Sequence, residues 1–346
     1  MSRIPQLDGL RAAAILMVFA AHGYQIPLLW TGVDLFFILS GYLITKVLFD
    51  LKDRRPEEGY WVPFYRRRGL RILPPFLLFF SAAAILFHTS WSHLWYWYAF
   101  FGANFAQAFG KSHVEALSPL WSLAVEEQFY LIWPFVVLFC SKKTLKKVAL
   151  LCLFVCPCLR AAATPFFSTH FPIYCLTVFR ADALCLGAFV AVSESLDSEW
   201  ASLYRRTAMY GSASALVLFA ALSTRSSFRT GANSILFNCM GYSLSILILG
   251  GMFIYVLGRR KGVSRSILAW APLRYLACIS YTFYLWHVAV LVELSRYFHS
   301  QSVIAVLSFV TTSLLAAGSW RFIERPLLSR KRSRSPQQFT AAAAAA

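Results

Sequence analysis

The sequence predicts an all-α polytopic membrane protein, and its composition and long apolar runs carry that prediction. Hydrophobic residues make up 58% of the 346 residues and charged residues only 14%, whereas soluble domains are roughly half apolar and a quarter charged. The mean hydropathy is +0.58. The apolar residues are gathered in long runs. This composition argues against a soluble enzyme and against a disordered chain.

About ten apolar runs are long enough for transmembrane helices, because a bilayer core about 30 Å thick needs about 20 apolar residues per helix. The segment 91–108 is ambiguous because it is rich in tryptophan and tyrosine, as segments at the membrane interface often are. We expect it to be a re-entrant piece or an extra span. The predicted spans are 10–30, 33–51, 72–87, 119–140, 148–166, 173–193, 208–223, 235–257, 275–294 and 303–322.

Positive charge is concentrated on one side of this predicted membrane. With 91–108 outside, the other side carries 23 lysine and arginine residues, in the two termini and in the loops 52–71, 141–147, 194–207 and 258–267. The outer loops carry only Lys111, Arg225, Arg229 and Arg296. The positive-inside rule therefore predicts that both termini are cytoplasmic. Contact with anionic lipids then explains the net charge of +18 without nucleic acid.

The chain is expected to form one membrane domain, 1–328, followed by a basic, low-complexity cytoplasmic tail, 329–346. No cleavable signal pattern precedes the first apolar run, so that run is expected to stay as a helix. The eight cysteines lie in or beside apolar runs, as small buried hydrophobic residues do. No cysteine–histidine spacing resembles a zinc site, so we expect neither a disulfide framework nor a metal.

The first span contains two ionisable residues, Arg11 and His22. A spacing of 11 residues is three helical turns, so both side chains share one face, about 16 Å apart along the axis. Intramembrane charges are costly and are functional candidates, although Arg11 could equally reach the headgroups and His22 could serve packing. Asp34, at the outer end of the second span, could orient His22 or simply cap its helix.

Further candidates are a basic cluster and several intramembrane charges. Arg67, Arg68 and Arg71 could share one face at a membrane entrance and bind phosphates, since guanidinium groups do so bidentately; a bare basic run is otherwise only a topology signal. Neighbouring carboxylates point in different directions on a helix. At most one of Glu126 and Glu127 therefore faces a cavity, and we take Glu127 as the site carboxylate and Glu126 as a substrate or structural candidate.

Arg180 and Asp182 are expected to reach other helices, because residues two apart do not pair on a helix. They are candidate partners of the two glutamates, in a structural or a substrate-binding role. Ser280, Tyr284 and His287 of the ninth span complete the substrate or structural candidates. An intramembrane histidine such as His287 is more often a packing residue than a catalytic one.

These stretches together resemble the integral-membrane acyltransferase family 3, which includes O-antigen, exopolysaccharide and macrolide O-acyltransferases. The resemblance covers about residues 4–328. The family's Arg-x10-His motif falls on Arg11 and His22. Other matching stretches are Leu7 to Arg11, Gly32 to Thr45, the Arg67, Arg68 and Arg71 cluster, Trp121 to Trp133, Arg180 to Gly187, Tyr281 to His287 and Glu324 to Pro326.

The resemblance implies an enzyme of the cell membrane that uses acyl-CoA from the cytoplasm as co-substrate, without a tightly bound cofactor. Its acceptor would be a hydroxyl, often of a glycan on the outer face. Some relatives carry an extracytoplasmic esterase-like domain, which we do not expect in this chain. The sequence leaves the acceptor, the acyl group and the oligomeric state open.

The chemistry agrees with this reading, because a histidine can take the proton of an attacking alcohol. A thiolate leaves readily, and no Gly-x-Ser-x-Gly elbow is present, so direct transfer is expected. The runner-up is a transporter of a lipid-linked sugar or an anionic substrate, which would also use intramembrane charges. A non-catalytic assembly protein is a third reading.

Overall fold

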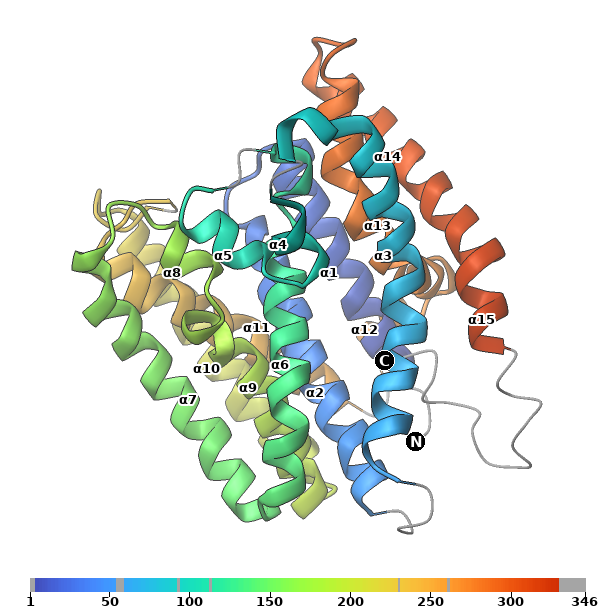
Figure 1. Ribbon diagram of the computed structural model, residues 1–346. Coiled ribbons are helices and arrows are strands. Elements are labelled where there is room, and N and C mark those ends of the chain that lie inside the picture. The colour runs from blue at the N-terminus through green and yellow to red at the C-terminus, as the bar shows by residue number, and fades with distance from the viewer. Residues whose placement is uncertain are drawn as a thin grey trace.

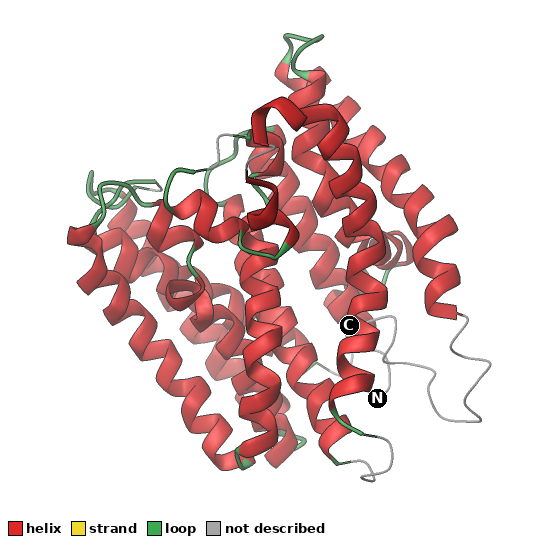
Figure 2. Cartoon of the chain, in the orientation of Figure 1, coloured by secondary structure: helices red, strands yellow, loops and turns green. Residues whose placement is uncertain are grey.

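The computed structural model describes residues 4–53, 59–91, 94–111, 114–229, 231–259 and 262–329. Throughout these ranges the regular secondary structure is helical, as Figure 2 shows. The predicted all-α fold class is therefore confirmed. Most of the predicted tail, 329–346, lies outside the described residues.

Ten long helices correspond to the ten predicted spans, and shorter helices connect them (Figure 1). Eight of the ten, in the described part of the chain, are long and apolar enough to cross a membrane. The other two are the first helix, of 19 residues, and α10, of 24 residues. The long helices are α1 (Pro5–Gly23), α2 (Gly32–Lys52), α3 (Trp61–Trp91), α6 (Leu120–Phe139), α7 (Lys142–Ala163), α9 (Thr177–Leu196), α10 (Trp200–Ser223), α11 (Tyr242–Leu257), α13 (Ala271–Leu294) and α14 (Gln301–Ser319).

The ambiguous segment 91–108 does not form an eleventh spanning helix. Its described part folds into two short helices, α4 (Trp95–Ala99) and α5 (Ala103–Ala108). Six residues of helix rise only about 9 Å, far less than a bilayer core. The remaining short helices are α8 (Phe171–Cys175), α12 (Val263–Leu268) and α15 (Arg325–Ser329).

A buried polar network holds α5 against the bundle. The amide of Asn104, which is fully buried, donates to Gln128 Oε1 at 3.3 Å and to Thr177 Oγ1 at 3.2 Å. Gln128 Nε2 donates back to Asn104 Oδ1 at 2.9 Å and to the Phe101 carbonyl at 3.0 Å. A buried amide whose partners are all present fixes a segment, because breaking any bond leaves an unpaired polar group. The network therefore ties α5 to α6 and α9.

Helices α2 and α9 cross at very short range in the centre of the bundle. In the apolar 18-residue stretch of each span, 78% of the residues are buried for the span that contains α2 and 72% for the span that contains α9. A Cβ atom at Gly41 would lie 1.9 Å from the Leu184 carbonyl oxygen, and one at Gly187 would lie 1.9 Å from the Ile38 carbonyl oxygen. Small residues permit such contact between membrane helices. Gly41 and Gly187 thus allow the backbones of α2 and α9 to touch.

The substitution Gly187→Ala should destabilise the folded protein, because backbone atoms of α2 cannot yield to the new methyl group as a flexible side chain could. We expect a loss of about 1–3 kcal/mol, measured as a lower thermal unfolding temperature in detergent. The matched control is Gly318→Ala in α14, where an added Cβ meets nothing within 4 Å. Equal melting temperatures for both variants would contradict the close crossing.

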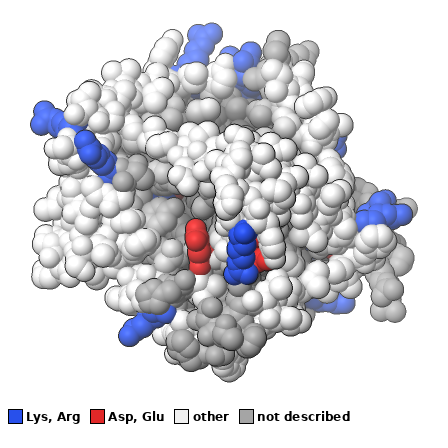
Figure 3. Space-filling model, turned by 90° about the horizontal axis from the view of Figure 1, so that it is seen from above, with Lys and Arg blue, Asp and Glu red and all other residues white. Residues whose placement is uncertain are grey.

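The helix ends fall on two opposite sides of the bundle. In Figure 1, α2, α6 and α9 end at the lower side, whereas α1, α7 and α13 end at the upper side. Figure 3 shows that the upper face is mostly uncharged, with a few separated lysine and arginine side chains. This agrees with the sparse charge of the predicted outer loops. The orientation in the cell stays a prediction from the positive-inside rule.

Cysteine labelling in intact cells tests this orientation. The substitution Arg229→Cys, at an exposed position beyond α10, should react with a membrane-impermeant thiol reagent added from outside. The substitution Asp53→Cys, at an exposed position just after α2, should react only after the cells are opened. The unmodified chain, with its eight free cysteines, gives the background. Strong external labelling at position 53 would reverse the predicted topology.

Candidate active site

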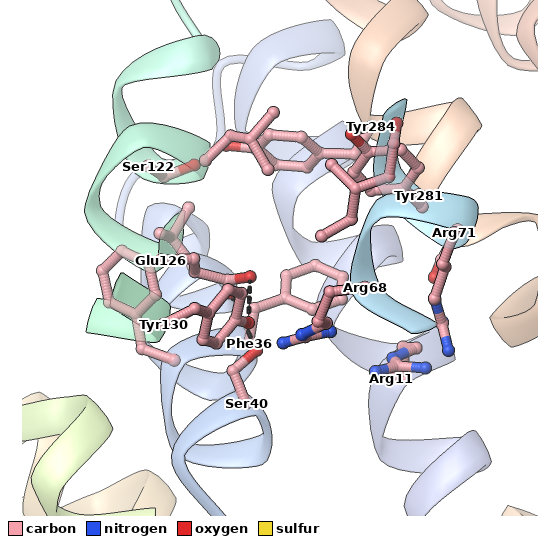
Figure 4. Close-up of a pocket in the computed structure, with 15 residues that line it drawn as sticks. Arg11, Phe36, Ser40, Arg68, Arg71, Ser122, Glu126, Tyr130, Tyr281 and Tyr284 are labelled. Carbon is pink, nitrogen blue, oxygen red and sulfur yellow. Dashed lines mark hydrogen bonds between the residues drawn. The ribbon is translucent and has the colours of Figure 1, made fainter. Parts of the chain in front are cut away.

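A pocket lies among α1, α2, α3, α6 and α13, and Figure 4 shows its labelled side chains. It contains about 680 Å³ of empty space, including its open mouth. Most of its polar side chains come from helices far apart in the sequence. The lining residues are Arg11, Val33, Phe36, Phe37, Ser40, Arg68, Arg71, Ile72, Ser122, Leu123, Glu126, Tyr130, Ser280, Tyr281 and Tyr284.

Three arginines from two helices meet at one end of this pocket. Arg68 and Arg71 are three residues apart on α3 and therefore share a face, and Arg11 approaches them from α1 (Figure 4). The Arg68 guanidinium lies 3.7 Å from the centroid of the Tyr130 ring. Among the described residues, no ion pair joins any of these three arginines to a carboxylate. Arg67, the third member of the predicted cluster, does not line the pocket.

The carboxylate that faces the arginines is Glu126. It accepts a hydrogen bond of 2.9 Å from Ser40 and one of 2.8 Å from Tyr130, one helical turn further along α6. Glu127 does not line the pocket, and its Oε1 is buried without a hydrogen-bond partner in the described structure. Our choice of Glu127 as the site carboxylate was therefore wrong. Adjacent helical residues point about 100° apart, and no pattern in the sequence showed which of the two glutamates faces the pocket.

The other end of the pocket is closed by a short hydrogen bond between two helices. The hydroxyls of Ser122 and Tyr284 are 2.5 Å apart, and both contact the Pro119 carbonyl at 3.1 Å. Ser280 and Tyr281 lie on the same helix as Tyr284 and also line the pocket. The Tyr281 hydroxyl donates to the carbonyl of Ile72 at 3.2 Å. Figure 4 shows the arginines and the Ser122–Tyr284 pair at opposite ends of the cavity.

His22 lies at the last turn of α1, beyond the pocket, and it meets His287 of α13. The His22 Nδ1 atom is 2.9 Å from the Val18 carbonyl and 3.3 Å from Nε2 of His287. The two rings are 5.0 Å apart between centroids, edge to face. His287 is fully buried, whereas His22 is exposed. Because His22 lies three helical turns after Arg11 on α1, the histidine pair is about 16 Å along the helix axis from the arginine end of the pocket.

Asp34 has partners other than the predicted His22. Its Oδ1 accepts from Arg180, and its Oδ2 accepts from Ser245 at 3.1 Å. Asp34 and Arg180 are both fully buried. The orienting role that we expected for Asp34 toward His22 must be corrected: its carboxylate is used by an ion pair between α2 and α9.

Asp182 forms a second buried ion pair, with Arg160 of α7 at 2.7 Å. Arg160 also donates to the carbonyls of Phe179 at 2.6 Å and Asn238 at 2.7 Å. Arg180 and Asp182 thus reach other helices, as predicted, but they are not the partners of the two glutamates. Sequence reasoning missed Arg160, although an isolated arginine inside the apolar run 148–166 was a usable signal.

Four pocket residues that contribute polar groups were also missed: Ser40, Ser122, Tyr130 and Tyr281. Only Tyr130 had a sequence signal, because it follows Glu126 at the spacing that lets helical side chains meet. The others face the pocket through contacts between helices, which spacing does not reveal. No cluster of three metal-ligating side chains occurs among the residues that the structure describes.

Comparison with known proteins identifies the family. The model described as "Acyltransferase domain" matches residues 4–320. YrhL of Bacillus subtilis, provisionally named a peptidoglycan O-acetyltransferase, is 30% identical over 364 residues, 94% of this chain and 55% of the relative. The peptidoglycan O-acetyltransferase OatA of Listeria monocytogenes is 27% identical over 94% of this chain and 56% of its own length. The O-acetyltransferase OatA of Staphylococcus aureus is 26% identical over 94% and 57%.

The chain spans a little over half the length of these relatives. No solved structure matches it significantly. Because the family model covers nearly all of the membrane helices that build the pocket and the histidine pair, this chain belongs to the acyltransferase-domain family.

Proposed function

We propose that this protein is a membrane O-acyltransferase that moves a short acyl group, such as acetyl, from acyl-CoA to a hydroxyl of a glycan. The single observation that carries the proposal is that the guanidinium groups of Arg11, Arg68 and Arg71 line one pocket without an ion pair to any described carboxylate, and that this pocket shares α1 with His22. One end of this arrangement suits an anionic donor, and the other end suits proton transfer.

The arginine end fits the phosphates of CoA. Buried charges require compensation, and the two buried arginines outside the pocket, Arg160 and Arg180, each have a carboxylate partner. Among the described residues the pocket arginines form no ion pair, and Glu126, the carboxylate that lines the same pocket, is already hydrogen-bonded to Ser40 and Tyr130. A ligand with several negative charges would supply the missing partners, and guanidinium groups bind phosphates in a bidentate manner.

The separation of the two ends also favours CoA over a compact acyl donor. A donor held by its phosphates at Arg11 must present its acyl carbon near His22, about 16 Å along the helix. Only a donor whose acyl group sits on a long, narrow arm can do both, and the pantetheine arm of CoA has that form. The Ser122–Tyr284 pair lies between the arginines and the histidine pair, so the pantetheine arm would have to pass it.

The transfer step needs one base. The acceptor hydroxyl loses its proton to His22 as its oxygen attacks the thioester carbonyl; the carbon–sulfur bond then breaks, and the CoA thiolate takes the proton back. The two relatives named as peptidoglycan O-acetyltransferases support a glycan acceptor and an acetyl group. Since they are nearly twice as long, the steps performed by their remaining length are not assumed for this chain.

The substitution His22→Ala should lower acyl transfer by at least the 10²–10⁴-fold that general-base help contributes. The assay incubates purified protein with labelled acetyl-CoA and a glycan acceptor and measures labelled product and released CoA. Binding of acyl-CoA should largely survive, since the base does not hold the nucleotide. The matched control is His299→Ala, at an exposed histidine after α13.

Two results would contradict this proposal. Near wild-type transfer by well-folded His22→Ala protein would place the base elsewhere. Movement of a glycan or anion across vesicles without any CoA release would favour the transporter.

The substitution Arg71→Ala should raise the Michaelis constant for acyl-CoA more than it lowers kcat, because it removes a charge that holds the donor's phosphates. A loss of one charged hydrogen-bonded contact corresponds to roughly tenfold or more in donor affinity. The control is Arg66→Ala, on the same helix but exposed and outside the pocket. If both variants keep the wild-type Michaelis constant for acyl-CoA, the arginine cluster acts only as a signal for membrane topology.

A further inference from the structure

The geometry points to His287 as a positioning residue that fixes the tautomer and orientation of His22 and leaves Nε2 of His22 as the atom that takes the acceptor's proton. This inference deepens the proposed function and rests on it. It starts from the contacts of two rings and from the rule that a carbonyl oxygen only accepts hydrogen bonds.

The hydrogen positions follow from the partners of each nitrogen. His287 Nδ1 lies 2.6 Å from the Tyr284 carbonyl, so this nitrogen carries a hydrogen. His22 Nδ1 lies 2.9 Å from the Val18 carbonyl, so it carries one too. His287 Nε2, at 3.3 Å from His22 Nδ1, must therefore present its lone pair, since two N–H groups cannot face each other. Neutral His22 is then left with a bare Nε2.

The surrounding packing holds both rings in this arrangement. The last turn of α1 is fixed by a hydrogen bond of 2.8 Å from the Gln301 side chain of α14 to the Gly23 carbonyl. Phe19, one turn before, packs edge-on against Phe283 and Phe309, at 5.7 and 5.2 Å between ring centroids. His287 is fully buried. Neither ring can therefore reorient without breaking contacts to α13 or α14.

His287 takes the role that a carboxylate has in other sites, where it accepts a hydrogen bond from the histidine that acts as base. When His22 takes a proton on Nε2, its Nδ1–H can donate to the lone pair of His287 and to the Val18 carbonyl, and both acceptors stabilise the imidazolium. A third group that orients the base is the general logic of such sites. Asp34, the carboxylate that the sequence suggested for this task, is held by Arg180. A neutral acceptor also avoids placing a second charge inside the bundle.

The first test compares two substitutions of His287. In His287→Gln, an amide oxygen can accept from His22 and the amide nitrogen can donate to the Tyr284 carbonyl; in His287→Leu, neither is possible. We expect His287→Leu to lower kcat by roughly tenfold to a hundredfold, the effect of one hydrogen bond to a charged group. The Michaelis constant for acetyl-CoA should stay within about twofold, and His287→Gln should recover much of the loss.

The outcomes separate positioning from packing. Equal losses in the Leu and Gln variants, or kcat within twofold of wild type in the Leu variant, would reduce His287 to a packing residue. A change in the Michaelis constant alone would make it part of the donor site. Thermal unfolding of both variants shows whether the folded state is kept.

A second measurement does not depend on activity. Nitrogen-15 NMR of histidine-labelled wild-type protein in nanodiscs reports which ring nitrogen carries the hydrogen, and His22→Ala and His287→Gln identify the two residues among the seven histidines. We expect Nδ1–H with bare Nε2 for both residues. A protonated Nε2 on neutral His22 would overturn the inference. A wild-type protein with the expected tautomers but no acyl transfer would instead refute the proposed function.

Discussion

The pairing of buried charges is the constraint on which the architecture depends. In the low dielectric of a helix bundle, an unpaired ion costs several kcal/mol, and its partner must come from another helix when the spacing forbids a local pair. Helix α9 supplies both buried ion pairs, Arg180 to Asp34 on α2 and Asp182 to Arg160 on α7. Together with the crossing at Gly187, these pairs fix α2 and α7 against one central helix. The face of α2 that lines the pocket is thereby set in place.

The pocket shows the opposite pattern, and this contrast supports the proposed donor site. Where arginines serve structure, the chain provides a carboxylate within hydrogen-bond reach. At Arg11, Arg68 and Arg71 no such ion pair occurs in the part of the chain that the structure describes, and Ser40 and Tyr130 already engage Glu126, the carboxylate that lines the pocket. Part of the cost of holding the Arg68 charge is met by the face of the Tyr130 ring. Cations arranged in this way fit the proposed anionic donor, because its phosphates would compensate their charge.

From the sequence, the helices and many of the residues of the site could be predicted, but the contacts between those residues could not. Apolar runs located the ten long helices, and helical spacing placed Arg68 and Arg71 on one face of α3, where both line the pocket. Spacing could not choose between Glu126 and Glu127, because the choice depends on how α6 is rotated against its neighbours. Helical spacing also could not reveal the contact between His22 and His287, which are 265 positions apart. Such contacts arise from the packing of α1 against α13, and no local pattern encodes them.

The division of the site along one helix has a mechanical consequence. Arg11 and His22 are carried by the same 19-residue helix, so their separation changes very little, unlike that of residues on two helices that can slide. In the proposed mechanism the donor's phosphates and the base would therefore be held at a constant span, and any adjustment would fall on the side chains between them. Tyr284 is the residue best placed for this, because its hydroxyl closes the pocket against Ser122 while its carbonyl holds His287. Tyr284 thus links the two parts of the site, because its side chain lines the pocket while its carbonyl accepts the Nδ1–H of His287.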